Sequence, residues 1–237
     1  MTIDRRTILG GMAAGLALAA RPAVADPAPV DVALVVAADV SNSIDSSDYM
    51  LQVGGMIGAL LDDDLLGLIR AGRHGAVAIA AIEWSDEVVT AADWHRVHDR
   101  RSMDVLCERL FGHERTLYGQ TDIALGLRAA IGLIARCPWR AERLVVDVSG
   151  DGLSKIPDFR VEGAVERGIE DLRIARALAD RHGIVVNGLA IAGEEDEDIA
   201  GYYRDHVVTG GGSFVVPVAG FEDFGRGMLR KLMTELA

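Results

Sequence analysis

Short runs of aliphatic and β-branched residues alternate along the chain with longer segments in which hydrophobic residues recur every three or four positions. The short runs are typical of strands buried in a sheet, and the longer segments are typical of amphipathic helices. The predicted buried strands are residues 31–38, 75–84, 143–148 and 184–191, with a last strand at 213–218. The more polar segment 87–97 is predicted to be an exposed edge strand that forms a hairpin with the strand before it.

Helical spacing follows most of the predicted strands. The predicted helices lie between residues 50 and 69, where Asp62, Asp63 and Asp64 interrupt the apolar face, and at 102–111, 122–135, 161–182 and 221–236. Strands that alternate with crossover helices predict an α/β fold, a doubly wound, mostly parallel six-stranded sheet with helices on both faces and one antiparallel edge strand. Such folds bind ligands beyond the carboxyl ends of their central strands. No internal repeat or linker divides residues 31–237, so we expect a single domain over residues 26–237.

Residues 1–25 differ from the rest of the chain and resemble a cleavable twin-arginine-type signal peptide. Arg5 and Arg6 precede an apolar stretch at residues 7–20, and Ala23-Val24-Ala25 offers a small-x-small cleavage site before Asp26. The alternative is an amphipathic first helix, which the absence of a polar face over residues 8–20 disfavours. No later stretch of about 18 apolar residues follows, so we expect a periplasmic or secreted protein without a membrane span.

Composition narrows the choice of partner. The chain has 237 residues, 36 of them acidic against 24 basic, and its formal net charge of −12 disfavours binding to nucleic acid. Two cysteines, Cys107 and Cys137, exclude a disulfide-dense scaffold and a Cys-rich zinc site. They could form one disulfide in an oxidising compartment, but only if their Cα atoms lie within reach of each other, which the sequence does not show.

Oxygen-bearing side chains gather in three predicted loops. Asp39, Ser41 and Ser43 follow the first strand at alternate positions, Thr121 lies in a tight loop before a helix, and Asp151 follows a buried strand. Hydroxyls with few carboxylates favour an octahedral Mg²⁺ or Mn²⁺ ion. The alternatives are structural: the Asp and Ser residues could cap the helix that starts near residue 45, Thr121 could cap the next helix, and Asp151 could belong to an ordinary turn.

These motifs resemble the von Willebrand factor A domain with its metal-ion-dependent adhesion site. The family pattern is Asp-x-Ser-x-Ser after the first strand, a Thr in a Gly-rich loop and an Asp-Gly after the fourth strand, which Asp39, Ser41, Ser43, Thr121 and Asp151 match. More narrowly, VSGDG, YYRDHVVTGGGSFVV and FEDFGRGMLRKL resemble the exported bacterial DUF1194 group, and the likeness covers nearly all of residues 31–237.

The sequence departs from the family pattern at two places. Gln120 precedes Thr121 where many members have Gly, and Gly150 precedes Asp151 where Thr-Asp-Gly is common. The second departure leaves Asp147 as a weaker alternative to Asp151, although Asp147 is expected to lie within the strand.

The resemblance implies a binding role in adhesion or assembly. We expect an exported module whose Mg²⁺ or Mn²⁺ ion binds an Asp or Glu side chain of an extracytoplasmic protein partner. Phosphate-loop, nucleophile-elbow, dinucleotide and zinc-protease motifs are all missing from the sequence, so we do not expect an enzyme. Two alternatives stay open: a metal-dependent hydrolase that uses the same site, with Lys155 just beyond Asp151, and a structural subunit with a degenerate metal site.

Overall fold

The computed structural model describes residues 28–154, 163–193 and 198–237. The predicted signal peptide at 1–25 and Lys155 lie outside these residues. In chain order the elements are β1 (Val30–Asp39), α1 (Ser46–Leu60), α2 (Asp63–Ala71), β2 (Val77–Trp84), β3 (Val88–Val97), α3 (Arg100–Phe111), α4 (Ile123–Ile134), β4 (Ala141–Gly150), α5 (Ala164–Arg181), β5 (Ile184–Ile191), α6 (Ile199–Tyr202), the π-helix η1 (Tyr203–Val207), β6 (Val215–Val218), the 3₁₀ turn η2 (Phe221–Asp223) and α7 (Phe224–Leu236).

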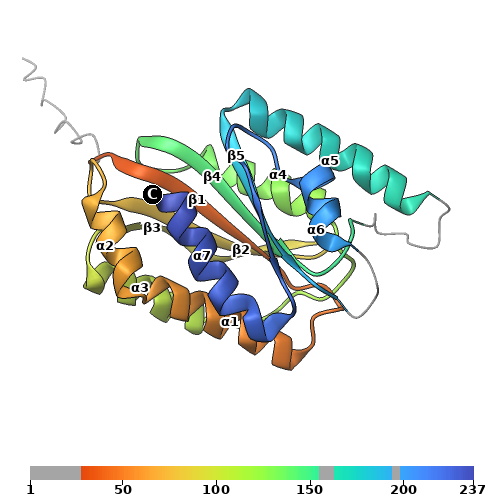
Figure 1. Cartoon of the computed structure of the whole chain (residues 1–237), viewed down its shortest axis with the longest axis horizontal. Coiled ribbons are helices and arrows are strands. Elements are labelled where there is room, and N and C mark those ends of the chain that lie inside the picture. The colour runs from red at the N-terminus through yellow and green to blue at the C-terminus, as the bar shows by residue number, and fades with distance from the viewer. Residues whose placement is uncertain (1–27, 155–162, 194–197) are drawn as a thin grey trace, which may run out of the picture.

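The six strands form one sheet in the order β3-β2-β1-β4-β5-β6 (Figure 1). Only the β2–β3 pair is antiparallel, which confirms the predicted hairpin and edge strand. β1 lies between β2 and β4, where the strand order reverses. The carboxyl ends of β1 and β4 therefore mark the topological switch point, the place at which folds of this kind bind ligands.

Helices cover both faces of the sheet, as the alternating pattern predicts (Figure 1). One apolar cluster joins alternate β1 residues such as Leu34 and Val36 to α1, α2, α3 and α7. A second cluster joins the intervening β1 residues, among them Val35, to α4, α5, α6 and η1. A strand whose two sets of side chains both enter a core reads as a continuous apolar run, which is the pattern seen at residues 31–38.

Aspartates set several helix boundaries. The apolar stripe between residues 50 and 69 forms two helices, because Asp62 accepts hydrogen bonds from the backbone N–H groups of Asp64 and Leu65 and caps the start of α2. β4 is longer than the strand predicted at residues 143–148 and extends to Gly150. It therefore ends directly beside the carboxyl end of β1, where Ala38 pairs with Ser149.

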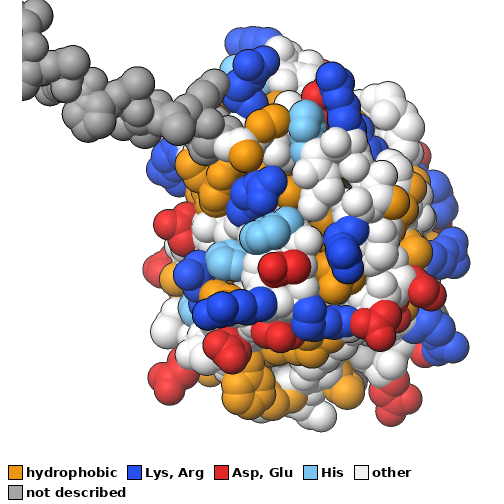
Figure 2. Space-filling view, turned by 90° about the vertical axis from the view of Figure 1, so that its left-hand side faces the viewer, with side chains coloured by type: hydrophobic (Ala, Val, Ile, Leu, Met, Phe, Trp, Pro, Cys, Tyr) orange, Lys and Arg blue, Asp and Glu red, His pale blue; other side chains and the backbone are white. Residues whose placement is uncertain are grey.

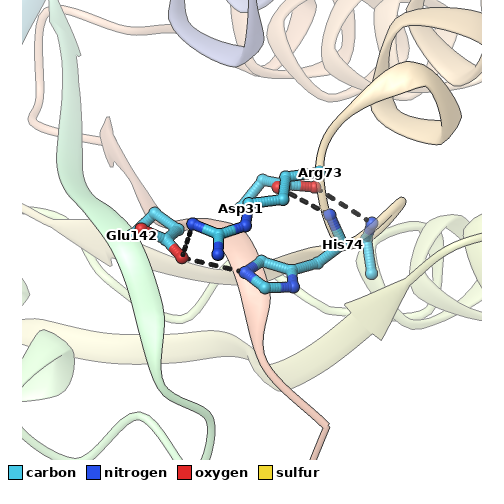
Figure 3. A network of polar contacts seen from close by, with 5 residues as sticks. Asp31, Arg73, His74 and Glu142 are labelled. Carbon is cyan, nitrogen blue, oxygen red and sulfur yellow. Dashed lines mark hydrogen bonds and ion pairs between the residues drawn. The ribbon is translucent and has the colours of Figure 1, made fainter.

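A polar network fastens the opposite end of the sheet, where β1 and β4 begin (Figure 3). Asp31 Oδ1 accepts the backbone N–H of His74 at 2.9 Å, and Glu142 Oε1 contacts His74 Nε2 at 3.0 Å and Arg73 at 3.3 Å. Figure 2 shows charged side chains of both signs, with histidines and hydrophobic side chains between them, on the end of the molecule that lies at the left of Figure 1.

The two cysteines lie on opposite faces of the sheet. Cys107 is buried in the cluster beneath α3, whereas Cys137 packs beside Trp94 and Trp139 on the side that α4 covers. Both thiols are free, so the structure contains no Cys107–Cys137 disulfide. Among the helices that the structure describes, none combines the length and hydrophobicity that a membrane span requires.

Candidate metal-binding site

The five predicted ligands come together at the switch point. Asp39 is the last residue of β1, Ser41 and Ser43 lie in the loop that leads to α1, and Asp151 directly follows β4. Thr121 comes from the loop before α4. Because β1 and β4 are adjacent and parallel, their carboxyl ends deliver both aspartates to the same edge of the sheet.

Hydrogen bonds link the five residues into one cluster, through four side chains and the backbone of Ser41. The backbone N–H of Ser41 donates to Asp39 Oδ1 at 2.8 Å, and the Ser41 hydroxyl lies 3.2 Å from that of Ser43. The Ser43 hydroxyl donates to Asp151 Oδ1 at 2.8 Å, while the Thr121 hydroxyl donates to Ser41 Oγ at 3.3 Å. Three loops that are far apart in the sequence therefore present their oxygens around one point.

The five residues of the cluster differ in their exposure to solvent. Asp39 and Ser41 are buried, Thr121 and Asp151 are half-buried, and Ser43 is exposed. Asp39 Oδ2 is buried and has no hydrogen-bond partner among the described residues. Burial, reinforced by the nearby charge of Asp151, raises the pKa of Asp39 to about 8. A buried carboxylate with a free oxygen and a like charge beside it is stabilised by a cation, and the exposed side of the cluster gives that cation access to solvent.

The helix-capping alternatives assign these residues to roles that other aspartates fill. Asp45 caps α1, since its carboxylate accepts from the backbone N–H groups of Ser47 and Asp48. Asp122 caps α4 by accepting from the N–H of Leu125 at 2.8 Å. The predicted ligands therefore remain available for chemistry at the switch point.

Asp147 does not reach the cluster. It lies within β4, its side chain is fully buried, and its Oδ1 is 2.6 Å from the Nζ of Lys231 in α7. The strand extends to Gly150, which places Asp151, the first residue after it, at the carboxyl edge. The geometry therefore favours Asp151 over Asp147 as the acidic oxygen from this strand.

Arg115, which the sequence analysis did not single out, holds two of the site loops together. Its guanidinium donates to the carbonyl oxygens of Val40, Ser41 and Ile44 at 2.8 to 3.1 Å, and to the carbonyl of Leu117 at 3.2 Å. The planar guanidinium can serve several carbonyls at once because it carries five N–H donors. Nothing in the local sequence distinguishes Arg115 from a surface arginine, since its partners lie more than 70 positions away for three of these bonds.

A second link joins the same two loops through the backbone. The N–H of Asn42 donates to the carbonyl of Gly119 at 2.9 Å, and the N–H of Gly119 donates to Asn42 Oδ1 at 3.1 Å. Gly119 has a φ of +152° and lies against Asp86, so no larger side chain fits there. These bonds hold Thr121 close to the Asp39 loop.

The residues present fit a hard divalent cation. Hydroxyl and carboxylate oxygens are the ligands that Mg²⁺ and Mn²⁺ prefer, and the buried, unpartnered oxygen of Asp39 needs a positive partner. In the described parts of the chain, no group of three or more His, Cys, Asp or Glu side chains is arranged to hold a metal ion. Serine and threonine hydroxyls must therefore supply part of any ligand set at the switch point.

Solved structures of known proteins share this architecture. The von Willebrand factor domain of the type V pili tip protein Mfa5 from Porphyromonas gingivalis superposes with a TM-score of 0.61 at 12% identity, over 87% of this chain and 95% of that one. The family described as "Protein of unknown function (DUF1194)" matches residues 29–237, and the chain belongs to this family. Among curated proteins, no relative matches.

Two further solved structures share the fold. The PilB minor pilin from Streptococcus sanguinis has a TM-score of 0.64 at 13% identity, over 88% of this chain and 63% of that one. Proximal thread matrix protein 1 from the mussel byssus, in a structure with a zinc-occupied MIDAS motif, has a TM-score of 0.57 at 15% identity, over 86% of this chain and 48% of that one. The matching region is thus less than two thirds of each of these two proteins.

Proposed function

We propose that this protein is an exported binding module that holds Mg²⁺ or Mn²⁺ at the switch point and uses the ion to bind an acidic side chain of a partner protein. Asp39, Ser41, Ser43, Thr121 and Asp151 would hold the ion. The observation that carries the proposal is the convergence of these five oxygen-bearing residues, from three loops, in one hydrogen-bonded cluster that includes the buried carboxylate of Asp39.

The charge of the cluster favours an anionic partner. Only two of the five side chains, Asp39 and Asp151, are carboxylates, so they do not over-neutralise a divalent ion that also binds neutral hydroxyls. When bound, the ion supplies a positive charge and a coordination position that a carboxylate oxygen from outside can complete. Because Ser43 is exposed, an acidic side chain can approach from that side of the cluster.

The structural neighbours support a binding role in general. They include a pilus tip protein, a minor pilin and a matrix protein whose MIDAS motif holds zinc. The proposal that this chain also acts as a binding module rests on the shared fold together with the clustered oxygens. The catalytic motifs missing from the sequence support a role without turnover.

Metal binding is tested by isothermal titration of Mg²⁺ and Mn²⁺ into residues 26–237. Asp39→Asn removes one charge from the cluster with almost no change in shape, and we expect it to weaken binding at least 100-fold. Asp45→Asn is the matched control: it removes a charge from the same loop, and Asn can still cap α1, so we expect unchanged affinity. A wild-type protein that binds neither ion contradicts the proposal and favours a structural subunit.

Partner binding is tested by affinity capture from a periplasmic extract, with Mg²⁺ or with a chelator, on wild type and on Asp39→Asn. We expect a partner that is retained only by wild type with metal, and whose retention is lost when one of its own Asp or Glu residues is replaced. Metal-dependent hydrolysis of p-nitrophenyl phosphate or p-nitrophenyl acetate by wild type, abolished in Asp39→Asn, would instead identify a hydrolase.

We further propose that residues 1–25 direct export and are then removed. Arg5→Lys and Arg6→Lys together keep the charge of the segment but change the paired arginines. We expect the full-length double variant to stay in the cytoplasm and the wild type to appear outside it, shortened by about 25 residues in its mass spectrum. Export of both proteins to the same extent rules out the twin-arginine route.

A further inference from the structure

Two buried oxygens beside the site have no hydrogen-bond partner within the described parts of the chain: Asp39 Oδ2 and the hydroxyl of Tyr203. Both face Gly150, the last residue of β4. A Cβ atom built at Gly150 would lie 2.6 Å from the Tyr203 hydroxyl and 2.9 Å from Asp39 Oδ2. Two oxygens this close to one point can share a water or, after a small movement of one side chain, bond directly.

The local structure aims Tyr203 at this point. Tyr203 begins the π-helix η1, and its side chain is fully buried against β4 and β5. The ring passes over Gly188 in β5, where an added Cβ would lie 2.6 Å from Tyr203 Cδ1. The absence of side chains at Gly188 and Gly150 therefore leaves room for the ring and its hydroxyl.

Gly150 is also the place where the sequence departs from the common Thr-Asp-Gly pattern. The Tyr203 hydroxyl takes the space that a side chain at position 150 would need, because such a side chain would collide with Tyr203 and with Asp39. A tyrosine hydroxyl is protonated at neutral pH and can donate one hydrogen bond.

We propose that Tyr203 is a positioning residue of the metal site, whose hydroxyl donates a hydrogen bond to Asp39 Oδ2, directly or through one water. With Oδ1 bound to the N–H of Ser41 and Oδ2 held by Tyr203, both oxygens of the carboxylate have a fixed direction. Each oxygen keeps a further lone pair for the cation or its hydration shell. Groups that orient a ligand in this way contribute 10- to 100-fold to metal affinity.

The inference rests on the proposed function and is tested with the metal ions alone. Tyr203→Phe removes only the hydroxyl and keeps the ring packed over Gly188 of β5. We expect its Mg²⁺ and Mn²⁺ affinities to fall about 10-fold or more, by isothermal titration, while the unfolding temperature without metal stays within about 2 °C of wild type. Tyr202→Phe is the control, because the Tyr202 hydroxyl accepts the N–H of Ser154 and is not among the groups beside Asp39 Oδ2; we expect unchanged affinity.

A pair of variants separates the hydroxyl from general packing. Gly150→Ala should weaken metal binding, because its Cβ meets the Tyr203 hydroxyl and Asp39 Oδ2. Adding Tyr203→Phe relieves one of these contacts, so the two changes should not be additive in affinity, and the double variant should bind no more weakly than Gly150→Ala alone.

The results of these titrations distinguish failure of the inference from failure of the proposed function. If wild type binds metal and Tyr203→Phe binds it equally well, the inference fails and the proposed function stands. If Tyr202→Phe loses as much affinity as Tyr203→Phe, the effect is one of packing and the inference fails. If wild type binds neither ion, the proposed function fails and the inference falls with it.

Discussion

Lys231 and Asp147 form an ion pair that has no contact with solvent, with the lysine Nζ 2.6 Å from the aspartate Oδ1. The same Nζ lies 2.5 Å from Oε1 of Glu235, one turn further along α7. Asn187 of β5 donates to this Glu235 oxygen at 2.9 Å. One buried cation therefore serves two buried carboxylates and joins the last helix of the chain to the middle of the sheet.

Loss of this cation should be costly. Lys231→Met keeps most of the side-chain volume but leaves Asp147 and Glu235 buried without a counter-charge. We expect the free energy of unfolding in urea to fall by about 3–5 kcal/mol. Arg230→Met, at an exposed position on the same helix, should change it by less than about 0.5 kcal/mol. A similar small change in both variants would mean that the pair contributes little.

The same cluster predicts a dependence of stability on pH. Burial raises the pKa of Glu235 from its ordinary 4.5 to about 7 in the folded protein, although Lys231 opposes the shift and Asp147 adds to it. Between these two values the folded state holds more protons than the unfolded state, so stability falls as the pH rises. We expect a loss on the order of 1–3 kcal/mol between pH 4.5 and 7, part of which Glu235→Gln should remove. Urea titrations of both proteins at several pH values measure the difference between their slopes.

Arg115 should contribute to stability through the loops it joins. Arg115→Ala leaves the carbonyls of Val40, Ser41 and Ile44 without their donor, and we expect a loss of about 2–3 kcal/mol in the free energy of unfolding. Arg115→Lys should recover only part of this, because an ammonium cannot match the planar fork. Arg101→Ala, at an exposed position in α3, is the control. Equal stability of wild type and Arg115→Ala would show that the loops hold together without it.

The cysteines should stay reduced even in an oxidising compartment. They lie on opposite faces of the sheet, and burial raises the pKa of Cys107 to about 11, which keeps its thiol protonated. We expect two titratable thiols per chain after denaturation of protein purified without reductant. Cys137→Ala should have the same unfolding temperature with and without dithiothreitol, as should wild type. A wild type that is stabilised by oxidation would contradict the separation of the two thiols.

The strands and the Asp39 loop could be predicted because their signals are local. A strand buried on both faces must be apolar along its whole length, and the run at 31–38 has this property. Right-handed crossovers predict parallel strands whose carboxyl ends share one edge of the sheet, and Asp39 and Asp151 follow two such strands. The similarity of Asp-x-Ser-x-Ser, Thr121 and Asp151 to a family pattern indicated the rest of the candidate ligand set.

Contacts between distant positions could not be predicted in this way. By contrast, the split of the stripe between residues 50 and 69 into two helices is local, because Asp62 caps α2 through the N–H groups two and three positions further along. The disulfide stayed open because the spacing of Cys107 and Cys137 says nothing about the face on which each lies. Asp147 was a weaker alternative to Asp151 because Gly150 departs from the common Thr-Asp-Gly pattern, and only the ion pair of Asp147 with Lys231 shows that it serves another role.

The sequence by itself determined the doubly wound sheet, its exposed edge hairpin and the group of oxygen-bearing residues at the ends of β1 and β4, because hydrophobic periodicity and short motifs are carried by neighbouring residues. Only the tertiary structure decided that Arg115 holds the site loops, that Lys231 neutralises Asp147 and that Tyr203 lies behind Asp39. The physical reason is that each of these side chains finds its partner tens of residues away, after helices pack on the sheet, and no local pattern records which distant polar group will be buried beside it.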